Sequence, residues 1–342
     1  MSVFSLIPDS PDPFSGEATF HRRILEALRA AGETVEERVV RGKDPTSRRD
    51  SAMGVLQSLP DGATLVVDSR VVPALVFALP MQRGRLRSVV SFHRAAHRGL
   101  EGEARQAAWA AERDTYQHVD RVLTSGLPGA MALGPLGVLP DQIGLILPAA
   151  DPTPAALSPG TGVFLMVGRL EPRKHHVHVL DALAELGRGE LRIAGSAAYS
   201  PAYAEQLEEE VHARGLRDRV SLLGALDSSE LRGAYAGSDL FIAADPQEDA
   251  GFAALNAIAA GVPVLAAASG GLPRTLPKQG VLWSEPGSAA GIQAVLDRWL
   301  NDSDARTHLA REAASARQRV RRWSTAHREV VREVAIARAL RS

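Results

Sequence analysis

The sequence predicts an α/β protein made of two domains, each with a parallel β-sheet. The chain has 342 residues, a length that favours two domains. Short apolar runs typical of strands alternate with helical patterns along it. Four prolines lie within residues 148–159, a composition typical of an extended linker. The simplest interpretation is two Rossmann-like domains joined by a hinge.

In the first half, an amphipathic helix is expected directly after the first strand. Ser15 and Gly16 open it, Phe20, Ile24 and Leu28 recur at helical spacing, and Gly32 ends it as a C-cap. The strands expected in this half are residues 3–7, 34–40, 64–67, 88–92, 121–124 and 143–147.

The second half repeats the alternation. A helix of small residues is expected over 251–260, closed by Gly261. Residues 303–340 show two helical patterns separated at Trp323, where Ser324 or Thr325 would serve as N-cap. The strands expected in this half are 163–167, 190–194, 220–223, 239–243, 262–266 and 280–283.

Composition excludes several classes of protein. The 39 Lys and Arg nearly balance the 40 Asp and Glu, so no strong net field would attract nucleic acid. With no cysteine, the chain has no disulfide, zinc-thiolate site or cysteine nucleophile. The first eight residues do not resemble a signal peptide, and no apolar run reaches the roughly 20 residues that span a bilayer. We expect a cytoplasmic protein, with oligomeric state unknown.

Two segments contain the candidate ligand-binding residues. In the first, a strand ends at Gly168, and two cations, Arg169 and Lys174, follow five residues apart. Arg forms paired hydrogen bonds to phosphate and Lys adds a point charge, so this spacing favours a diphosphate site. In the second, Glu248 follows the strand 239–243 and precedes the small-residue helix, and a Gly270-Gly271 loop follows the next strand.

Together these segments resemble the donor-binding half of the GT-B glycosyltransferases of family 4, the glycosyl transferases group 1, over roughly residues 160–285. The resemblance rests on Gly168, Arg169, Lys174, Glu248, Gly251, Ala257, Gly261, Pro263, Val264, Gly270 and Gly271. It implies two Rossmann-like domains facing each other across a cleft, with a C-terminal helix that crosses back. The expected domains are 1–150 with the returning helix 324–342, and 160–323.

The resemblance also implies a retaining transfer of a sugar from a nucleotide diphosphate, with UDP or GDP as carrier and no metal requirement. The expected donor-binding positions are Gly16, Gly168, Arg169, Lys174, Leu223, Gly251, Phe252, Asn256, Gly270 and Gly271. The expected catalytic positions are His93, Arg169, Lys174 and Glu248, with Glu248 accepting hydrogen bonds from sugar hydroxyls. Glu248 at a helix start is also consistent with simple capping.

Position 256 departs from the family pattern, which has a ribose-binding glutamate there, eight residues after the first. Counted as helix, this separation is about 12 Å at about 1.5 Å per residue. Asn256 still accepts and donates hydrogen bonds. Replacing a charged acceptor by a neutral one costs about 1 kcal/mol, or roughly fivefold in affinity. An Asn satisfied within the fold is the competing interpretation.

The first half is expected to supply the rest of the site. Gly16 would lie near the phosphates, His93 near the donor sugar, and Asp68 with Ser69 near the acceptor. A basic series is consistent either with an anionic acceptor or membrane headgroups, or with a solvated charged face: Arg83, Arg85, Arg87, Arg94 and Arg98.

Other chemistries lack support. His175, His176 and His178 suggest a metal cluster, but adjacent histidines on a helix point apart. No strand is followed by Gly-x-Gly-x-x-Gly, and there is no Gly-Lys-Ser/Thr P-loop. We therefore expect a glycosyltransferase acting on a small-molecule or lipid acceptor. The alternative is a non-catalytic GT-B subunit that binds or stabilises a partner.

Overall fold

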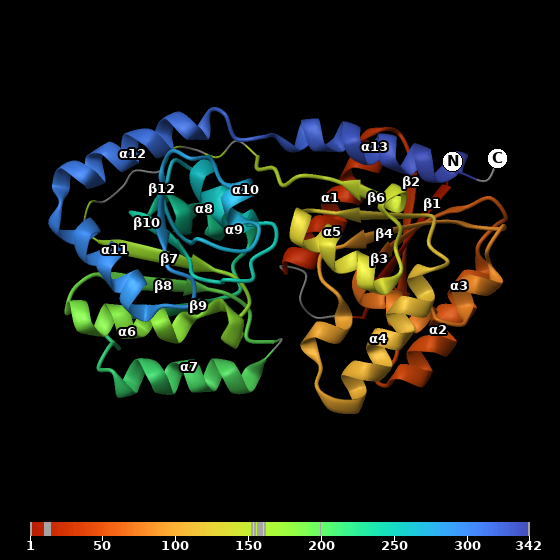
Figure 1. Cartoon of the computed structure of the whole chain (residues 1–342), viewed down its shortest axis with the longest axis horizontal. Coiled ribbons are helices and arrows are strands. Elements are labelled where there is room, and N and C mark those ends of the chain that lie inside the picture. Colours follow the sequence, from red (N-terminus) through yellow and green to blue (C-terminus); the bar gives the residue numbers. More distant parts are fainter. Residues whose placement is uncertain are drawn as a thin grey trace. The chain divides into compact units, whose positions relative to one another are not determined.

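Two six-stranded parallel sheets organise the part of the chain described by the computed structural model, residues 2–9, 15–151, 153, 155, 160, 162–198 and 200–340 (Figure 1). The chain divides into two compact units. The first combines Met1–Leu147 with Trp323–Ser342, and the second is Pro148–Arg322. The sequence placed the end of the first domain at 150, three residues later, and the start of the second at 160, twelve residues later; the second junction differs by one residue. Prolines 152, 154 and 159 of the predicted linker lie outside the described residues.

The first unit has the sheet order β2-β1-β3-β4-β5-β6. Its strands are β1 Ser2–Pro8, β2 Thr34–Val40, β3 Thr64–Asp68, β4 Arg87–Phe92, β5 Arg121–Thr124 and β6 Ile143–Leu145. Its helices are α1 Gly16–Ala30, α2 Pro45–Ser58, α3 Ala78–Met81, α4 Gly102–Tyr116, α5 Leu127–Leu133 and α13 Trp323–Ala339. Short 3-10 turns follow β3 (Ser69–Leu75), β4 (Ala96–Gly99) and α5 (Gly134–Leu136), and one precedes β6 (Pro140–Gln142).

Helix α1 forms as its sequence predicts. The Ser15 hydroxyl caps it by accepting a hydrogen bond from the backbone N–H of Ala18 at 3.1 Å. Phe20, Ile24 and Leu28 are buried on one face. Gly32, with φ of 85°, reverses the chain after the last turn, in a conformation that glycine adopts at little cost.

Helix α13, from the end of the chain, belongs to the first unit and packs on α1, β4 and β5 (Figure 1). Its Glu333 is buried and accepts hydrogen bonds from the guanidinium of Arg121, with Nε at 2.7 Å. Arg338 pairs with Glu33 at 2.6 Å and donates to the Thr64 hydroxyl at 2.9 Å.

The predicted cap of α13 was wrong. The break after α12 (Ser303–Arg317) covers residues 318–322, and Trp323 is already helical. Ser324 and Thr325 therefore lie inside the first turn. Trp323 is buried, with Arg23 stacked 5.0 Å from its ring centroid, so tertiary packing of this aromatic sets the start of the helix.

The second unit has the sheet order β12-β11-β10-β7-β8-β9. Its strands are β7 Val163–Val167, β8 Glu190–Ala194, β9 Val220–Gly224, β10 Leu240–Ala243, β11 Val264–Ala267 and β12 Val281–Ser284. Its other helices are α6 His176–Leu186, α7 Pro201–Ala213, α8 Ser228–Ala236, α9 Phe252–Ala259, α10 Leu272–Thr275 and α11 Ala289–Asn301.

Both faces of the second sheet are covered, because successive side chains of a strand point to opposite sides. Phe164 and Met166 of β7 pack in one core with residues of α6, α7 and α11. Leu165 of the same strand packs in the other core, with residues of α8 and α9. The near-continuous apolar strands of the sequence follow from this double burial.

The twelve predicted strands were confirmed to within two residues at each end. The largest shifts are at β6, which stops at Leu145, and at β11, which begins at Val264. Pro263 precedes β11 and has no N–H to donate, although its carbonyl accepts from Phe241 at 2.9 Å.

Candidate functional site

The strand order of the second unit places a topological switch point between β7 and β10. Read from β7 in chain order, the sheet is 3-2-1-4-5-6, the doubly wound arrangement in which ligands bind outside the carboxyl ends of the two central strands. Phe164 pairs with Leu240 here. The two segments singled out in the sequence leave from these two strand ends, so the fold brings them together.

Gly168 and Arg169 follow β7 directly. The Gly168 N–H donates to the carbonyl of Ala194 at 3.0 Å, and a Cβ on Gly195 would collide with the Gly168 carbonyl oxygen. A 3-10 turn, Pro172–Lys174, then carries Lys174, one residue before His175 and ahead of helix α6. Lys174 therefore lies in the 3-10 turn, two residues before α6 begins.

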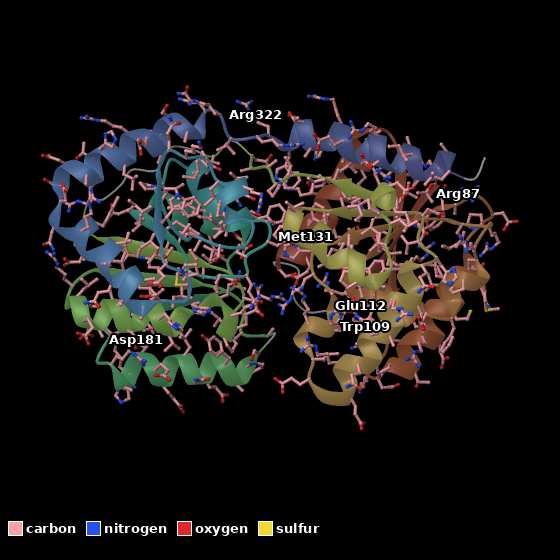
Figure 2. The ribbon with its side chains drawn as sticks, in the orientation of Figure 1. Arg87, Trp109, Glu112, Met131, Asp181 and Arg322 are labelled. Carbon is pink, nitrogen blue, oxygen red and sulfur yellow. The ribbon has the colours of Figure 1, made fainter. Side chains whose placement is uncertain are left out.

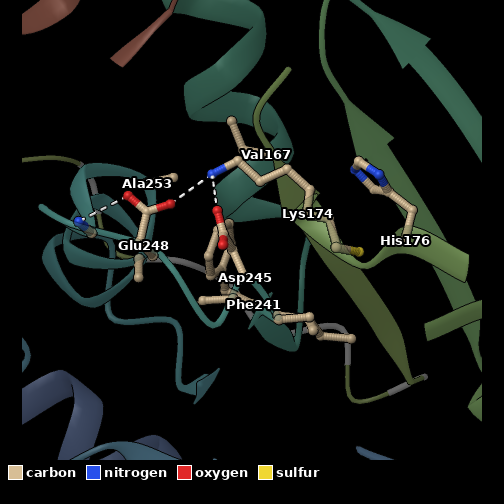
Figure 3. Close-up of a pocket in the computed structure, with 13 residues that line it drawn as sticks. Val167, Lys174, His176, Phe241, Asp245, Glu248 and Ala253 are labelled. Carbon is tan, nitrogen blue, oxygen red and sulfur yellow. Dashed lines mark hydrogen bonds and ion pairs between the residues drawn. The ribbon is translucent and has the colours of Figure 1, made fainter. Parts of the chain in front are cut away.

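Lys174 and Glu248, which are 74 residues apart in sequence, meet at this switch point (Figure 3). The Lys174 ammonium lies 2.6 Å from Oε2 of Glu248 and 3.2 Å from Oδ2 of Asp245. The other carboxylate oxygen of Glu248 accepts the backbone N–H of Gly251 at 3.1 Å. Glu248 thus combines a contact with the predicted phosphate-binding lysine and a bond to the backbone just ahead of α9.

Sequence reasoning missed Arg173, Glu171 and Asp245, which complete the cluster. The Arg173 guanidinium hydrogen-bonds to Oδ2 of Asp245 and lies 2.8 Å from Oε1 of Glu171. Burial alone would lower the pKa of Arg173, but the carboxylates of Asp245, Glu171 and Glu248 outweigh it and raise that pKa. The signal was present, since Asp245 follows the end of β10 at a switch point.

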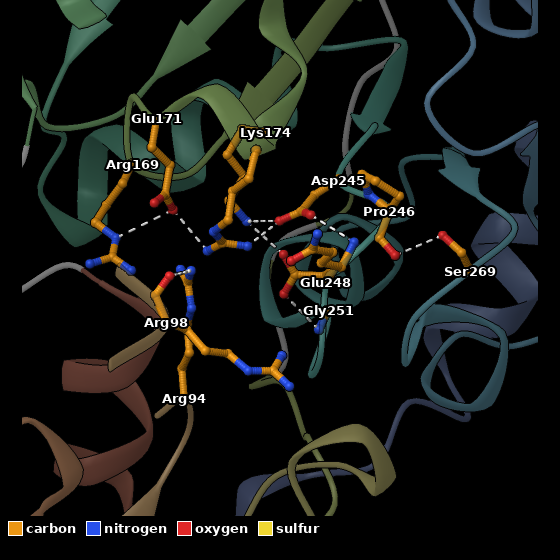
Figure 4. A network of polar contacts seen from close by, with 12 residues as sticks. Arg94, Arg98, Arg169, Glu171, Lys174, Asp245, Pro246, Glu248, Gly251 and Ser269 are labelled. Atoms are coloured by element: carbon orange, nitrogen blue, oxygen red, sulfur yellow. Dashed lines mark hydrogen bonds and ion pairs between the residues drawn. The ribbon is translucent and has the colours of Figure 1, made fainter. Parts of the chain in front are cut away.

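The cluster is a chain of alternating charges (Figure 4). Arg169 Nε lies 3.7 Å from Oε1 of Glu171, which is the first link. Its formal charges sum to zero: three cations, Arg169, Arg173 and Lys174, against three carboxylates, Glu171, Asp245 and Glu248. Because Asp245 is 2 % exposed and Glu171 6 %, these pairs are only weakly screened by water.

The Gly270-Gly271 loop packs on the backbone that carries Glu248. Gly271 donates its N–H to the Glu248 carbonyl at 2.7 Å, and the Ser269 hydroxyl donates to the Pro246 carbonyl at 2.9 Å. A Cβ on Gly270 would collide with the Glu248 carbonyl, and one on Gly271 with that of Asp249. The absence of side chains here is required by packing, whatever these glycines contribute to ligand binding.

Helix α9 starts later than expected, because Gly251 adopts a left-handed conformation with φ of 66°. Glu248 therefore sits in a turn, and the helical estimate of its separation from position 256 does not hold. The Asn256 side chain is half-buried and makes no hydrogen bond to any described residue. Of the remaining donor-binding candidates, Phe252 is the first residue of α9, and Leu223 on β9 is 36 % exposed.

A small cavity of about 30 Å³ lies at the same strand ends, lined by residues that include Lys174, His176, Asp245 and Glu248 (Figure 3). This volume accommodates one or two water molecules. The cluster itself, rather than this cavity, is therefore the candidate binding surface.

In the first unit, Gly16 and His93 come together. A Cβ on Gly16 would lie 3.0 Å from Nε2 of His93, so the start of α1 approaches the ring closely. Nδ1 of His93 lies 3.4 Å from the hydroxyl of buried Ser125. Two sequence candidates are thereby adjacent within this unit.

The loop that follows His93 is held by Glu112, a fully buried carboxylate on α4 (Figure 2). Its two oxygens accept the backbone N–H groups of Ala96 at 2.8 Å and His97 at 3.0 Å. Nδ1 of His97 lies 2.6 Å from the same carboxylate. This fixes the course of the chain just after the predicted sugar-facing residue.

Two weaker candidates of the first unit have structural roles. Asp68 is 1 % exposed, and both its oxygens accept hydrogen bonds from the Arg70 guanidinium, at 2.9 and 2.8 Å. Within the basic series, Arg85 donates to the carbonyls of Leu56, at 2.6 Å, and Leu59. In these contacts, Asp68 binds the side chain of Arg70, and Arg85 binds the backbone at the end of α2.

The histidine group divides between two environments. His176 is buried, and its Nδ1 lies 3.3 Å from the Tyr203 hydroxyl. The rings of His175 and His178, three residues apart in the sequence, lie tilted by 34° with centroids 4.5 Å apart. Among the described residues, no group of three or more His, Cys, Asp or Glu is arranged to hold a metal. Nor does any helix within those residues have the length and apolarity needed to cross a membrane.

Comparison with known proteins finds similarity concentrated in the second unit. Residues 152–316 match the family described as glycosyl transferases group 1. The match covers just under half of the chain. A D-inositol 3-phosphate glycosyltransferase of Segniliparus rotundus is 32% identical over 43% of this chain and 35% of its own. The chain spans less than half the length of the curated relatives that it matches first.

Solved structures extend the likeness to both units. Anabaena Alr3699/HepE, in complex with UDP and glucose, has a TM-score of 0.79 at 17% identity, covering 98% of this chain and 99% of its own. Sucrose-phosphate synthase from Thermosynechococcus elongatus has a TM-score of 0.80 at 18% identity, covering 97% and 98%. The chain therefore has the two-domain GT-B fold predicted from the sequence.

Proposed function

We propose that this protein is a retaining glycosyltransferase of family 4 type, which moves a sugar from a nucleoside diphosphate to an acceptor hydroxyl. The observation that carries the proposal is the meeting of Lys174 and Glu248 at the switch point of the second sheet. A cation for the diphosphate and a carboxylate for sugar hydroxyls then stand side by side. The UDP complex of the structural neighbour HepE makes UDP the first nucleotide to test.

In the proposed reaction, the bond between the anomeric carbon and the diphosphate breaks, and negative charge grows on the departing phosphate. Arg169 and Lys174 would stabilise that charge more strongly in the transition state than in the bound donor. These fixed cations would meet the diphosphate charge without a metal ion. Gly168 at the end of β7 has no Cβ, which would lie 3.2 Å from Cε of Lys174 and crowd the lysine that would bind the phosphates.

Glu248 would accept hydrogen bonds from the donor sugar, exchanging its contact with Lys174 for sugar hydroxyls. No protein nucleophile is needed if the acceptor hydroxyl attacks from the face of the leaving group and a diphosphate oxygen takes its proton. The protein then acts by orientation and charge stabilisation. His93 and Gly16, adjacent in the first unit, would contribute to the donor sugar and phosphates.

The non-catalytic alternative is not favoured, because the residues expected for donor chemistry in the second unit are brought together. The proposal is tested by incubating the protein with UDP- and GDP-sugars, with and without EDTA, and measuring release of the nucleoside diphosphate. We expect release with at least one donor, undiminished by EDTA and lost in Lys174→Ala. NMR of the product would give the anomeric configuration. Binding of nucleotide without any release would instead support a non-catalytic subunit.

A further inference from the structure

The carboxylate of Asp245 lies within the proposed diphosphate site, where a negative charge opposes the ligand. Its Oδ2 is 3.2 Å from the Lys174 ammonium and also accepts from Arg173, and its Oδ1 accepts the Gln247 N–H at 2.8 Å. Asp245 is 2 % exposed. These contacts hold the carboxylate in one place, so its charge remains in the site whether donor or product is bound.

The donor and the product of the proposed reaction differ in charge. In a nucleotide sugar, both phosphates are esterified and each carries one negative charge. After the sugar leaves, the terminal phosphate keeps only its anhydride bond to the other phosphate, and its second ionisation near pH 6 adds almost one further negative charge at pH 7.5. A fixed anion beside that phosphate therefore acts more strongly on the product than on the donor.

The distances show that this difference is large enough to matter. A phosphate oxygen that accepts from Lys174 at about 2.8 Å would lie within about 6 Å of Asp245 Oδ2, given the 3.2 Å between Oδ2 and the ammonium. Repulsion between unit charges at this separation, in a partly buried site, changes a binding constant by about tenfold or more.

We propose that Asp245 is a specificity-determining residue that weakens binding of the nucleoside diphosphate product relative to the sugar-linked donor. The inference rests on the proposed function of the site. Because the three carboxylates of the cluster offset most of the field of its three cations, the extra charge of the product gains less in the native site than it would beside the cations alone. Removing the Asp245 charge leaves a net cation and favours the product.

The test is calorimetric titration of UDP and UDP-glucose, and of GDP and GDP-mannose, into the wild-type protein and Asp245→Asn. At pH 7.5, we expect the preference for diphosphate over nucleotide sugar to rise about tenfold in the variant. At pH 5.5 most of this rise should disappear, because the terminal phosphate is protonated. In the wild type, the preference should change less than about twofold between these pH values.

The control is Asp181→Asn, which removes one carboxylate from a pair with Arg214 in the same unit, 2.7 Å apart (Figure 2). It should leave the preference unchanged. If Asp245→Asn does not fold, Asp245→Ser replaces it in the same titrations. The pH dependence of the wild-type preference is measured without any variant. Two results overturn this inference alone. One is that the Asp245 variants bind both ligands with the wild-type preference for diphosphate over nucleotide sugar. The other is that this preference rises tenfold with pH in the wild type. If neither pair binds the wild type, the proposed function falls with it.

Discussion

Variants of Glu248 distinguish a structural role from a role in donor binding. One carboxylate oxygen contacts the Lys174 ammonium and the other accepts the Gly251 N–H. In Glu248→Ala, the Gly251 N–H loses its acceptor at 3.1 Å, whereas Lys174 keeps Asp245 at 3.2 Å. Loss of one such backbone acceptor costs about 1 kcal/mol. We expect the free energy of unfolding to fall by about 1 to 2 kcal/mol. Each kcal/mol lowers Tm by about 2 to 4 °C.

Glu248→Gln is the matched variant, since its amide oxygen still accepts the Gly251 N–H while the charge is lost. Its melting temperature should stay near that of the wild type. Turnover should fall about tenfold to a hundredfold in both variants, because a hydrogen bond from a sugar hydroxyl to a charged acceptor is lost in the transition state. Melting curves and donor-cleavage rates of the wild type, Glu248→Ala and Glu248→Gln measure these two effects. Near-normal turnover in Glu248→Gln, with lost stability in Glu248→Ala, would leave this residue a purely structural role.

Three further predictions concern the same unit. UDP or GDP at 100 times its Kd should stabilise the protein by about 2.7 kcal/mol, and Arg169→Ala or Lys174→Ala should remove most of the resulting melting shift. No shift with any nucleotide at millimolar concentration would contradict the donor site. Asn256→Glu should fold normally, since the Asn256 side chain is half-buried and makes no hydrogen bond to a described residue. It should tighten nucleotide binding by up to about 1 kcal/mol. Weaker nucleotide binding in calorimetry would refute a ribose contact at this position. Burial, with smaller effects of Lys174 and His175, lowers the pKa of His176 from 6.5 to about 3. Since the unfolded chain takes up this proton first as pH falls, stability should drop between pH 6.5 and 3, by about 1.4 kcal/mol per pH unit below 6.5. His176→Gln should show a flatter dependence in urea unfolding at pH 6.5 and 4.5, and equal slopes would show that another group governs it.

The sequence was sufficient for the strands and for the first helix, because those depend on local patterns. Apolar runs gave the strands of both sheets, and Ser15 with Gly32 gave the ends of α1. The start of α13 could not be found in this way. It depends on burial of Trp323 against a distant part of the chain, and local capping signals at Ser324 were misleading.

The candidate site was predictable only in outline. The motifs assigned Lys174 to the phosphates and Glu248 to the sugar of one donor site, and the fold brings the two side chains to 2.6 Å. The position of Asp245 after β10 was a signal for the site, but its pairing with Arg173 is a contact across 72 residues of sequence, which only the fold reveals. Gly270 illustrates the opposite case, where a motif residue expected to face the ligand is also required by close backbone packing.

The position of α13 has a consequence for how the protein is made. The first unit begins with the first strand, yet it needs a helix translated after the whole of Pro148–Arg322. At ordinary synthesis rates, this delay lasts roughly ten to thirty seconds. During that interval, Arg121 has no Glu333 to neutralise it, and the face of α1 that meets α13 stays uncovered. The first unit therefore completes its fold only after the whole of the second has been synthesised.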